Sequence, residues 1–155
     1  MKRGILLFLL TAGFLLAADK PREMERYRQI AEKPHVTVQD MVDLILMTRG
    51  EFEKNHTEAQ RFQMARNEGW VKGEPVVLLD RGALAYALIL NYNITRGWLF
   101  RLTRWNRYAL RDVQEAGVLS PRYSAGNSVS GAQLVGAINA AEEYKTEKEE
   151  WPSRH

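Results

Sequence analysis

The residues best suited to binding lie between positions 93 and 107, where arginines alternate with aromatic side chains. An arginine can pair with two oxygens of a carboxylate or phosphate, and a tryptophan face can stack on a sugar ring or a cation. We therefore expect a surface for an envelope partner, an acidic glycan or lipid headgroups, formed by Trp98, Arg101, Arg104 and Trp105. The alternative is that Trp98, Phe100, Trp105 and Tyr108 fill the gap between the two helical units and the arginines cover them.

A second group of candidate binding residues is spread over two predicted loops and the start of the helix between them. Its members are Trp70, Lys72, Arg81, Arg122 and Tyr123. We expect them to converge on a glycan or another anion if the helical units pack around one central helix. The helix N-termini at Asp80 and Ser130 would add partial positive charge there. For Trp70, which directly follows a glycine, the alternative is packing on the preceding helix.

Residue types that carry catalysis or bind metals are few and scattered. The histidines His35, His56 and His155 stand in predicted loops or in the tail, and none has a second histidine at a metal-ligand spacing. No nucleophile elbow, phosphate loop or zinc pattern occurs. We therefore expect no catalytic residue, no metal site, no cofactor and no enzymatic activity.

The elements that must position these residues begin at three similar helix starts. The N-caps are Thr37, Asp80 and Ser130, and each has an apolar residue just before it and another four residues after it. This is the spacing of a capped helix with a hydrophobic staple. Setting the caps in register aligns apolar positions at helical spacing: Met41 with Leu84 and Leu134, and Ile45 with Leu88 and Ile138. The agreement predicts an internal repeat.

A second helix precedes two of these starts and ends at a glycine, Gly69 or Gly117. The repeated unit is therefore a helix, a loop and a capped helix. We expect an all-α fold of degenerate helix-loop-helix repeats packed around a central apolar helix that runs from Asp80 to about Asn91. The other expected helices span about 37–47, 57–69, 103–116 and 130–144.

The start of the chain is typical of a secretory signal. Residues 1–18 combine a positive Lys2-Arg3 pair, an apolar run and Ala17-Ala18 before Asp19. We expect export to the periplasm or cell envelope of a bacterium; an uncleaved anchor is the alternative. The remaining chain is divided into a linker at 19–35, the helical domain at 36–144 and a charged tail at 145–155.

Charge and cysteine content narrow the classes of partner. The chain has 22 basic and 19 acidic residues, but two of the basic ones, Lys2 and Arg3, belong to the predicted signal. The rest is almost neutral, so a nucleic-acid partner is not expected. Because there is no Cys, no disulfide supports the exported fold.

The chain holds two and a half copies of the predicted repeat unit, which are fewer than repeat packing usually needs. Self-association is therefore also expected.

The unit resembles the S-layer homology repeat. The matching residues are Gly69-Trp70-Val71 with Leu79-Asp80-Arg81-Gly82-Ala83-Leu84, and Ala116-Gly117-Val118-Leu119 with Val129-Ser130-Gly131-Ala132-Gln133-Leu134. Members of that family typically use three repeats to bind acidic cell-wall polysaccharide, and an arginine at the helix start contributes to the site. The resemblance implies this role for Arg81, while Val38 and Gly131 stand at the same position of the other copies.

These observations together predict an exported, non-enzymatic envelope protein that binds an envelope glycan or an envelope protein through its repeat loops. Peripheral contact with a membrane is compatible with the same surface. The alternative is a structural or assembly subunit of a larger periplasmic or envelope complex that binds no glycan.

Overall fold

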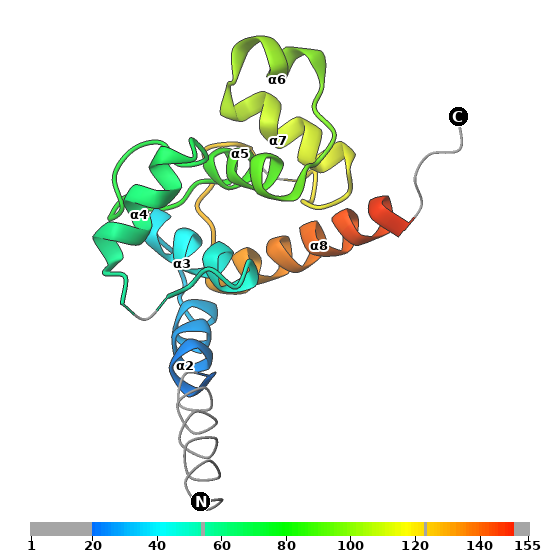
Figure 1. Cartoon of the computed structure of the whole chain (residues 1–155). Helices are drawn as coiled ribbons and strands as arrows, with labels where there is room; N and C mark the ends of the chain where they lie inside the picture. Colours follow the sequence, from blue (N-terminus) through cyan, green and yellow to red (C-terminus); the bar gives the residue numbers. More distant parts are fainter. Residues whose placement is uncertain (1–19, 54, 123, 151–155) are drawn as a thin grey trace, which may run out of the picture.

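The computed structural model describes residues 20–53, 55–122 and 124–150 (Figure 1). Within these ranges there are seven helices and no β-strand, which confirms the predicted all-α class. The helices are α2 (Lys20–Ala31), α3 (Val38–Thr48), α4 (Glu58–Asn67), α5 (Arg81–Tyr92), α6 (Trp98–Thr103), α7 (Asn106–Glu115) and α8 (Gly131–Glu150). The predicted signal at 1–18 lies outside the described residues. Among the described helices, none has the length and hydrophobicity that a membrane span requires.

Side-chain caps hold the helix starts as the sequence predicts. Thr37 and Asp40 form a reciprocal capping box at α3, and Thr57 and Gln60 form another at α4. At α5 the carboxylate of Asp80 accepts a hydrogen bond of 2.7 Å from the amide of Ala83. At α8 the amide of Gln133 donates to Ser130 Oγ, and the amide of Ser130 donates to Gln133 Oε1. These bonds satisfy amides that would otherwise lack partners.

The three apolar residues before the caps of α3, α5 and α8 meet through a closed cycle of backbone hydrogen bonds. The amide of Val36 donates to the carbonyl of Val129 (3.0 Å), that of Val129 to Leu79 (3.1 Å), and that of Leu79 to Val36 (2.8 Å). We call this cycle the backbone ring. All three side chains are buried. Three segments far apart in the sequence are thus joined at one point.

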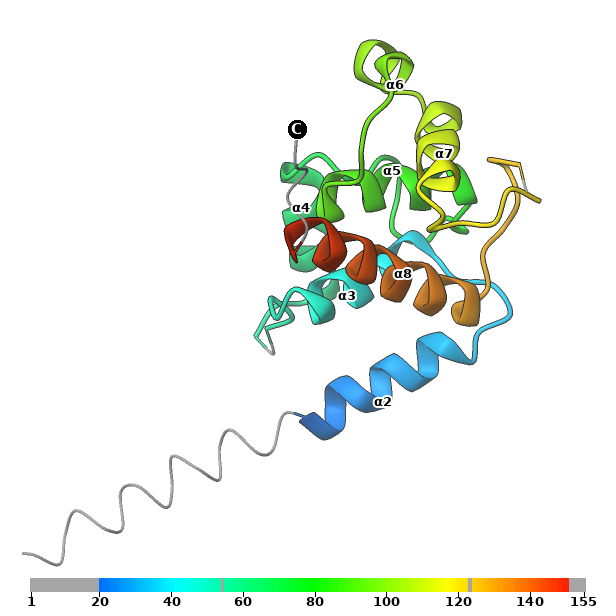
Figure 2. The ribbon, with the colours of Figure 1, turned by 90° about the vertical axis from the view of Figure 1, so that its right-hand side faces the viewer.

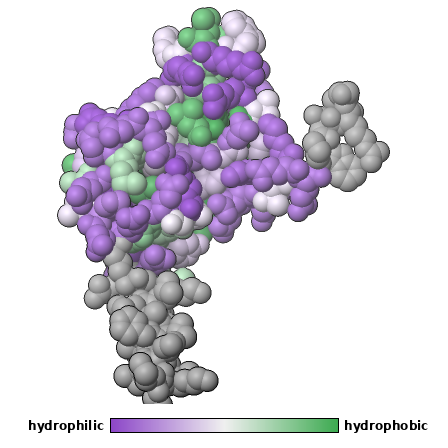
Figure 3. Space-filling view, in the orientation of Figure 1, coloured by the Kyte–Doolittle hydropathy of each residue, from purple (hydrophilic) through white to green (hydrophobic). Residues whose placement is uncertain are grey.

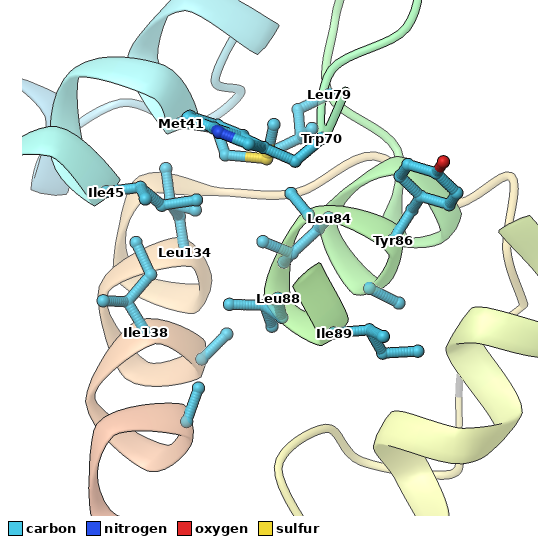
Figure 4. Close-up of a cluster of buried hydrophobic side chains, with 14 of the residues drawn as sticks. Met41, Ile45, Trp70, Leu79, Leu84, Tyr86, Leu88, Ile89, Leu134 and Ile138 are labelled. Carbon is cyan, nitrogen blue, oxygen red and sulfur yellow. The ribbon is translucent and has the colours of Figure 1, made fainter. Parts of the chain in front are cut away.

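The hydrophobic core lies between the helices that start at the backbone ring. Figure 4 shows Met41 and Ile45 of α3 beside side chains of α5 and α8. The side chains from α5 are Leu84 and Leu88, and those from α8 are Leu134 and Ile138. All six residues are almost fully buried. The positions that align in sequence therefore meet in space. Helix α5 is buried on nearly every side, and only three of its twelve residues are not buried.

The structure differs from the expected helix boundaries in three places. The predicted linker contains the three-turn helix α2, which Ile30 and the ion pairs of Arg26 with Asp40 and Asp43 hold to the body. Helix α6 occupies the Arg-rich segment, where no helix was expected before about position 103. Helix α8 continues to Glu150, into the first part of the predicted tail.

The two ends of the body carry different elements. Helix α2 leaves the body at one end, and α6 projects from the opposite end (Figures 1 and 2). Helix α8 runs past α5 between them. The Arg-rich segment thus lies far from the point at which the chain enters α2.

Candidate functional site

Four basic side chains line one cavity beside α6. The cavity has a volume of about 500 Å³. Its walls come from the end of α5, the segment before α6, α6 itself and α8, with Asn93, Ile94, Thr95, Arg96, Arg101, Arg104 and Lys148 as lining residues. As far as the structure describes the chain, no Asp or Glu is among them. We call it the cationic cavity; its chemistry suits a carboxylate or phosphate group.

Two left-handed residues direct the chain around this cavity. Asn93 ends α5 with a φ of 52°, and Arg104 ends α6 with a φ of 55°. Asparagine adopts this conformation readily, whereas for arginine it is strained. The amide of Arg104 donates to the carbonyl of Phe100 (2.9 Å) and its guanidinium lies over the Phe100 ring. The left-handed residues Asn93 and Arg104, one before α6 and one at its end, therefore help to place Arg101 and Arg104 at the cationic cavity.

Helix α8 supplies the fourth cation from a distant part of the sequence. The ammonium of Lys148 lies 3.3 Å from Thr95 Oγ1 and 3.5 Å from the carbonyl oxygen of Asn93. One turn earlier, the hydroxyl of Tyr144 lies 3.0 Å from Thr95 Oγ1. These contacts explain why α8 continues beyond its predicted end, and they fix one wall of the cationic cavity.

Two large apolar side chains stand exposed on the outer face of α6. Trp98 is 72% exposed and Leu102 is 75% exposed. Their spacing of four residues puts them on one face of the helix. We call this pair the apolar tip. Figure 3 shows a hydrophobic patch at this end of the molecule, in the place that Figure 1 gives to α6.

The other aromatic residues of the segment divide between surface and core. Phe100 is fully buried and packs edge to face on Tyr86, with 5.6 Å between ring centroids. Trp105 is 54% exposed, and one of its faces stacks on Tyr108. The gap-filling alternative therefore holds for Phe100, holds in part for Tyr108, which is half-buried against the core, and fails for Trp98 and Trp105. All four residues of the expected partner surface, Trp98, Arg101, Arg104 and Trp105, are exposed.

The second predicted group converges only in part. Trp70 and Lys72 line one cavity of about 120 Å³ between the start of α3 and the side of α5. Lys72 is engaged there: its ammonium lies 3.9 Å from the centroid of the Tyr86 ring and donates to the carbonyl of Arg104 (3.0 Å). Trp70 is 2% exposed, and its indole donates to Glu68. Trp70 is thus a core residue that lies beside Met41 and Leu79 (Figure 4), and the hydrogen bond from its indole to Glu68 joins it to the end of the preceding helix.

The remaining members of that group do not line this cavity. Arg81 is only 5% exposed at the first position of α5. Arg122 lies exposed on the loop before α8, and Tyr123 is outside the described residues. The burial of Arg81 leaves it little surface to offer a polysaccharide.

The helix N-termini do not present the free amides that the sequence led us to expect. In α5 the amides of Arg81 and Gly82 donate to carbonyls of Asn127 and Ala125, and Asp80 accepts from the third. In α8 the amide of Gly131 donates to the carbonyl of Lys33 (2.8 Å), and Ser130 accepts from Gln133. Carbonyl groups of the loops thus occupy the amides that an anion would bind. The positive charge of the cationic cavity comes from side chains instead.

A further polar cavity of about 650 Å³ lies where α3, α5 and α8 approach the end of α4. Its central cation, Arg49, is bound by Glu51, Glu68 and Asn91. Burial raises the pKa of Glu68, but hydrogen bonds from Arg49 and Trp70 outweigh it and lower the pKa below its usual value. Burial raises the pKa of Tyr92 to about 12, although Thr48 donates to or accepts from its hydroxyl. The arginine is thus already neutralised by its neighbours.

In the described part of the chain, no group of three or more His, Asp or Glu side chains is placed to hold a metal ion.

Sequence reasoning did not single out Arg96, Leu102 or Lys148. Arg96 belongs to the same Arg-rich segment as Arg101 and Arg104 and could have been included with them. Leu102 could have been found from its spacing to Trp98, because residues four apart share a helix face. Lys148 had no local signal, since its contribution depends on α8 passing the end of α5.

Compared with models of protein families the chain matches none, and comparison with curated proteins gives no significant match. Function therefore has to be inferred from the cationic cavity, the apolar tip and the packing that positions them.

Proposed function

We propose that this chain is an exported, non-enzymatic protein of the bacterial cell envelope and that it binds an acidic envelope glycan at the cationic cavity. One observation carries the proposal. Arg96, Arg101, Arg104 and Lys148 line one cavity, and the described lining residues include no acid. Such a cavity attracts carboxylate or phosphate groups and discriminates against neutral or basic ligands.

The size and surroundings of the cavity fit a glycan. A volume of about 500 Å³ is in the range of small-ligand sites, so one or two sugar units can enter it. Trp105 comes directly after Arg104 and is about half exposed, although Tyr108 stacks on its ring and the guanidinium of Arg107 lies 4.7 Å from the ring centroid; its exposed part offers a sugar an aromatic contact. Polar side chains of Asn93 and Thr95 can bond sugar hydroxyls.

The proposed architecture is an internal repeat of three helix starts. The backbone ring supports it, because Val36, Leu79 and Val129 are related by one and the same exchange of hydrogen bonds. The loops add a second parallel: the amides of Val38 and Arg81, at the first positions of α3 and α5, donate to Val77 and Asn127 in the loop before the next start. An S-layer homology-like origin would explain this relationship. The proposed ligand site differs from the one that resemblance implies, because Arg81 is buried.

The non-enzymatic part of the proposal rests on the sequence, which contains no recognised catalytic motif. Export rests on the signal-like pattern of residues 1–18.

The test is co-sedimentation of the chain with purified cell-wall sacculi and titration with a soluble acidic polysaccharide. The binding variant is Arg101→Ala/Arg104→Gly; glycine suits the left-handed conformation of position 104, so the guanidinium is removed without strain. The control Arg28→Ala/Arg66→Ala removes the same charge from exposed sites on α2 and α4. We expect binding by the wild type and the control and its loss in the binding variant.

The proposal is overturned if the wild type binds neither sacculi nor acidic polysaccharide, or if both double variants bind equally well. A second function would then be favoured by a different observation. Val76, Val77 and Leu78 form an exposed apolar strip before α5, with exposed fractions of 81%, 53% and 55%. Such a strip is suited to docking in a larger envelope complex, as an assembly subunit would do.

A further inference from the structure

We infer that the apolar tip and the cationic cavity dock the protein on the surface of a bilayer that contains anionic lipid. The inference rests on the proposed function in one respect, the preference of the cavity for anions. It adds a second ligand, the lipid surface, and gives a role to Trp98 and Leu102 that a soluble glycan leaves unexplained.

The apolar tip is held rigidly in an exposed position. Phe100, on the inner face of α6, is fully buried, and the amide of Gly97 at the helix start donates to Asp112 of α7 (2.8 Å). Trp98 and Leu102 point away from these contacts, since each is more than 70% exposed. An indole at the boundary between headgroups and acyl chains, with leucine inserted beside it, is typical of proteins that bind a membrane surface.

The charges around the tip complement an anionic bilayer. Arg101 lies between Trp98 and Leu102 in sequence and lines the cationic cavity, together with Arg104 and Lys148. When the apolar tip enters the apolar layer of the bilayer, these basic side chains lie at the level of the headgroups and bind their phosphate groups. The tip and the basic side chains therefore act on the same surface.

Two acidic residues of α7, Asp112 and Glu115, line a cavity together with Trp98, and both are already engaged. Asp112 is 9% exposed and bonded to Gly97, and Glu115 pairs with Arg111 at 2.7 Å. The charge of Glu115 is thus offset by Arg111. Residues 93–107 hold four arginines and no acid.

A bilayer fits this surface better than a glycan alone does. Leucine offers no hydrogen bond and no stacking face to a sugar, so Leu102 would remain exposed in a glycan complex. The projection of α6 from the body, on the end opposite to α2, lets a flat surface reach the tip first (Figures 1 and 2). Docking there does not require α2 to approach the bilayer.

The experiment uses a chain that begins at Asp19, so that the apolar residues 1–18 do not bind lipid themselves. The buried hydrophobic residues of the described chain run from Ile30 to Ala141, so this chain keeps all of them. It is mixed with phosphatidylcholine vesicles that contain or lack phosphatidylglycerol, and binding is measured by co-sedimentation. Insertion is measured by quenching of tryptophan fluorescence with brominated lipid, and circular dichroism checks the fold of each variant.

We expect binding to the phosphatidylglycerol vesicles, weakening as salt is added, and little binding to phosphatidylcholine alone. Trp98→Ala/Leu102→Ala should weaken binding by about tenfold or more, and Trp98→Phe should retain most of it. The matched control is Val76→Ala/Leu78→Ala, which removes equally exposed apolar side chains elsewhere and should bind as the wild type does.

The inference is overturned if the wild type ignores phosphatidylglycerol vesicles, if the tip variant binds them unchanged, or if the control loses as much binding as the tip variant. Its failure is distinct from that of the proposed function. The tip variant should keep its affinity for soluble acidic polysaccharide, and Arg101→Ala/Arg104→Gly should lose both ligands. Vesicle binding without polysaccharide binding would reject the glycan proposal alone.

Discussion

The carboxylate of Asp112 accepts a hydrogen bond of 2.8 Å from the backbone amide of Gly97 and so joins the start of α6 to the middle of α7. Gly97 itself offers no side-chain cap. A Cβ atom at this position would lie 2.7 Å from the Asp112 carboxylate, so a larger residue would displace that carboxylate. The orientation of the apolar tip therefore depends on a residue outside the proposed membrane-binding surface.

Replacing Asp112 with alanine should loosen α6. We expect a loss of about 1–3 kcal/mol in the free energy of unfolding, because a partly buried amide loses its acceptor. Amide hydrogen exchange of Gly97 and Trp98 should quicken more than that of α3. Asp112→Asn keeps an acceptor oxygen and should cost less; equal losses in the two variants would show that the bond does not hold α6.

Leu78 and Leu79 are neighbours with opposite environments, and they give a direct test of the core. Leu79, in the backbone ring, is fully buried, whereas Leu78 is 55% exposed. Leu79→Ala should lower the free energy of unfolding by about 2–5 kcal/mol, since it leaves a cavity where three segments meet. Leu78→Ala should change it by about 0.5 kcal/mol or less. Urea unfolding of both variants measures the difference, and similar losses would contradict the observed burial.

The helix starts could be predicted from the sequence because their signals are local. A cap, its partner three residues later and a flanking apolar pair are read within six residues, and Thr37, Asp80 and Ser130 all cap helices in the structure. The glycines that end α4 and α7 are also local signals, and Gly69 and Gly117 both have a φ of 78°.

The elements that were missed depend on contacts with distant residues. Helix α2 has a polar sequence and is held by Asp40 and Asp43 of α3, which pair with Arg26. The cationic cavity shows the same division: Arg101 and Arg104 were visible as a local cluster, but Lys148 joins them only because α8 passes Thr95. Local patterns also led to a wrong expectation at the helix N-termini, because they do not show which loop carbonyls will occupy the amides.

Two glycines of α8 have opposite surroundings, which predicts opposite effects of alanine. A Cβ at Gly131 would lie 1.8 Å from the carbonyl oxygen of Ile30, whereas one at Gly136 would meet nothing within 4 Å. Gly131→Ala should therefore push α2 away from α8 and lower the melting temperature. Gly136→Ala should raise it, by a stabilisation of about 0.5–1 kcal/mol, because alanine favours a helix interior. A Gly131→Ala variant as stable as the wild type would mean that α2 does not pack on the start of α8.

Acid should weaken the attachment of α2 through Asp40. Burial raises the pKa of this carboxyl, but hydrogen bonds from Lys33 (2.8 Å) and Thr37 (2.9 Å) outweigh it and hold the pKa below its usual value of 3.8. A carboxyl with a lowered pKa stabilises the fold above its unfolded-state pKa, and this stabilisation is lost as the pH falls through the folded-state value. The free energy of unfolding should therefore decline from about pH 4 downward.

The Asp40→Asn variant separates this effect from the rest of the acid response. It should be less stable than the wild type at neutral pH, because Lys33 and Arg26 lose their charged partner. Between pH 7 and pH 3 it should lose less stability than the wild type does, since its side chain no longer titrates. Some decline should remain, because the pKa of Glu68 is also lowered. Urea unfolding of both proteins across this range gives the comparison; parallel curves would show that Asp40 does not carry the acid sensitivity of the α2 contact.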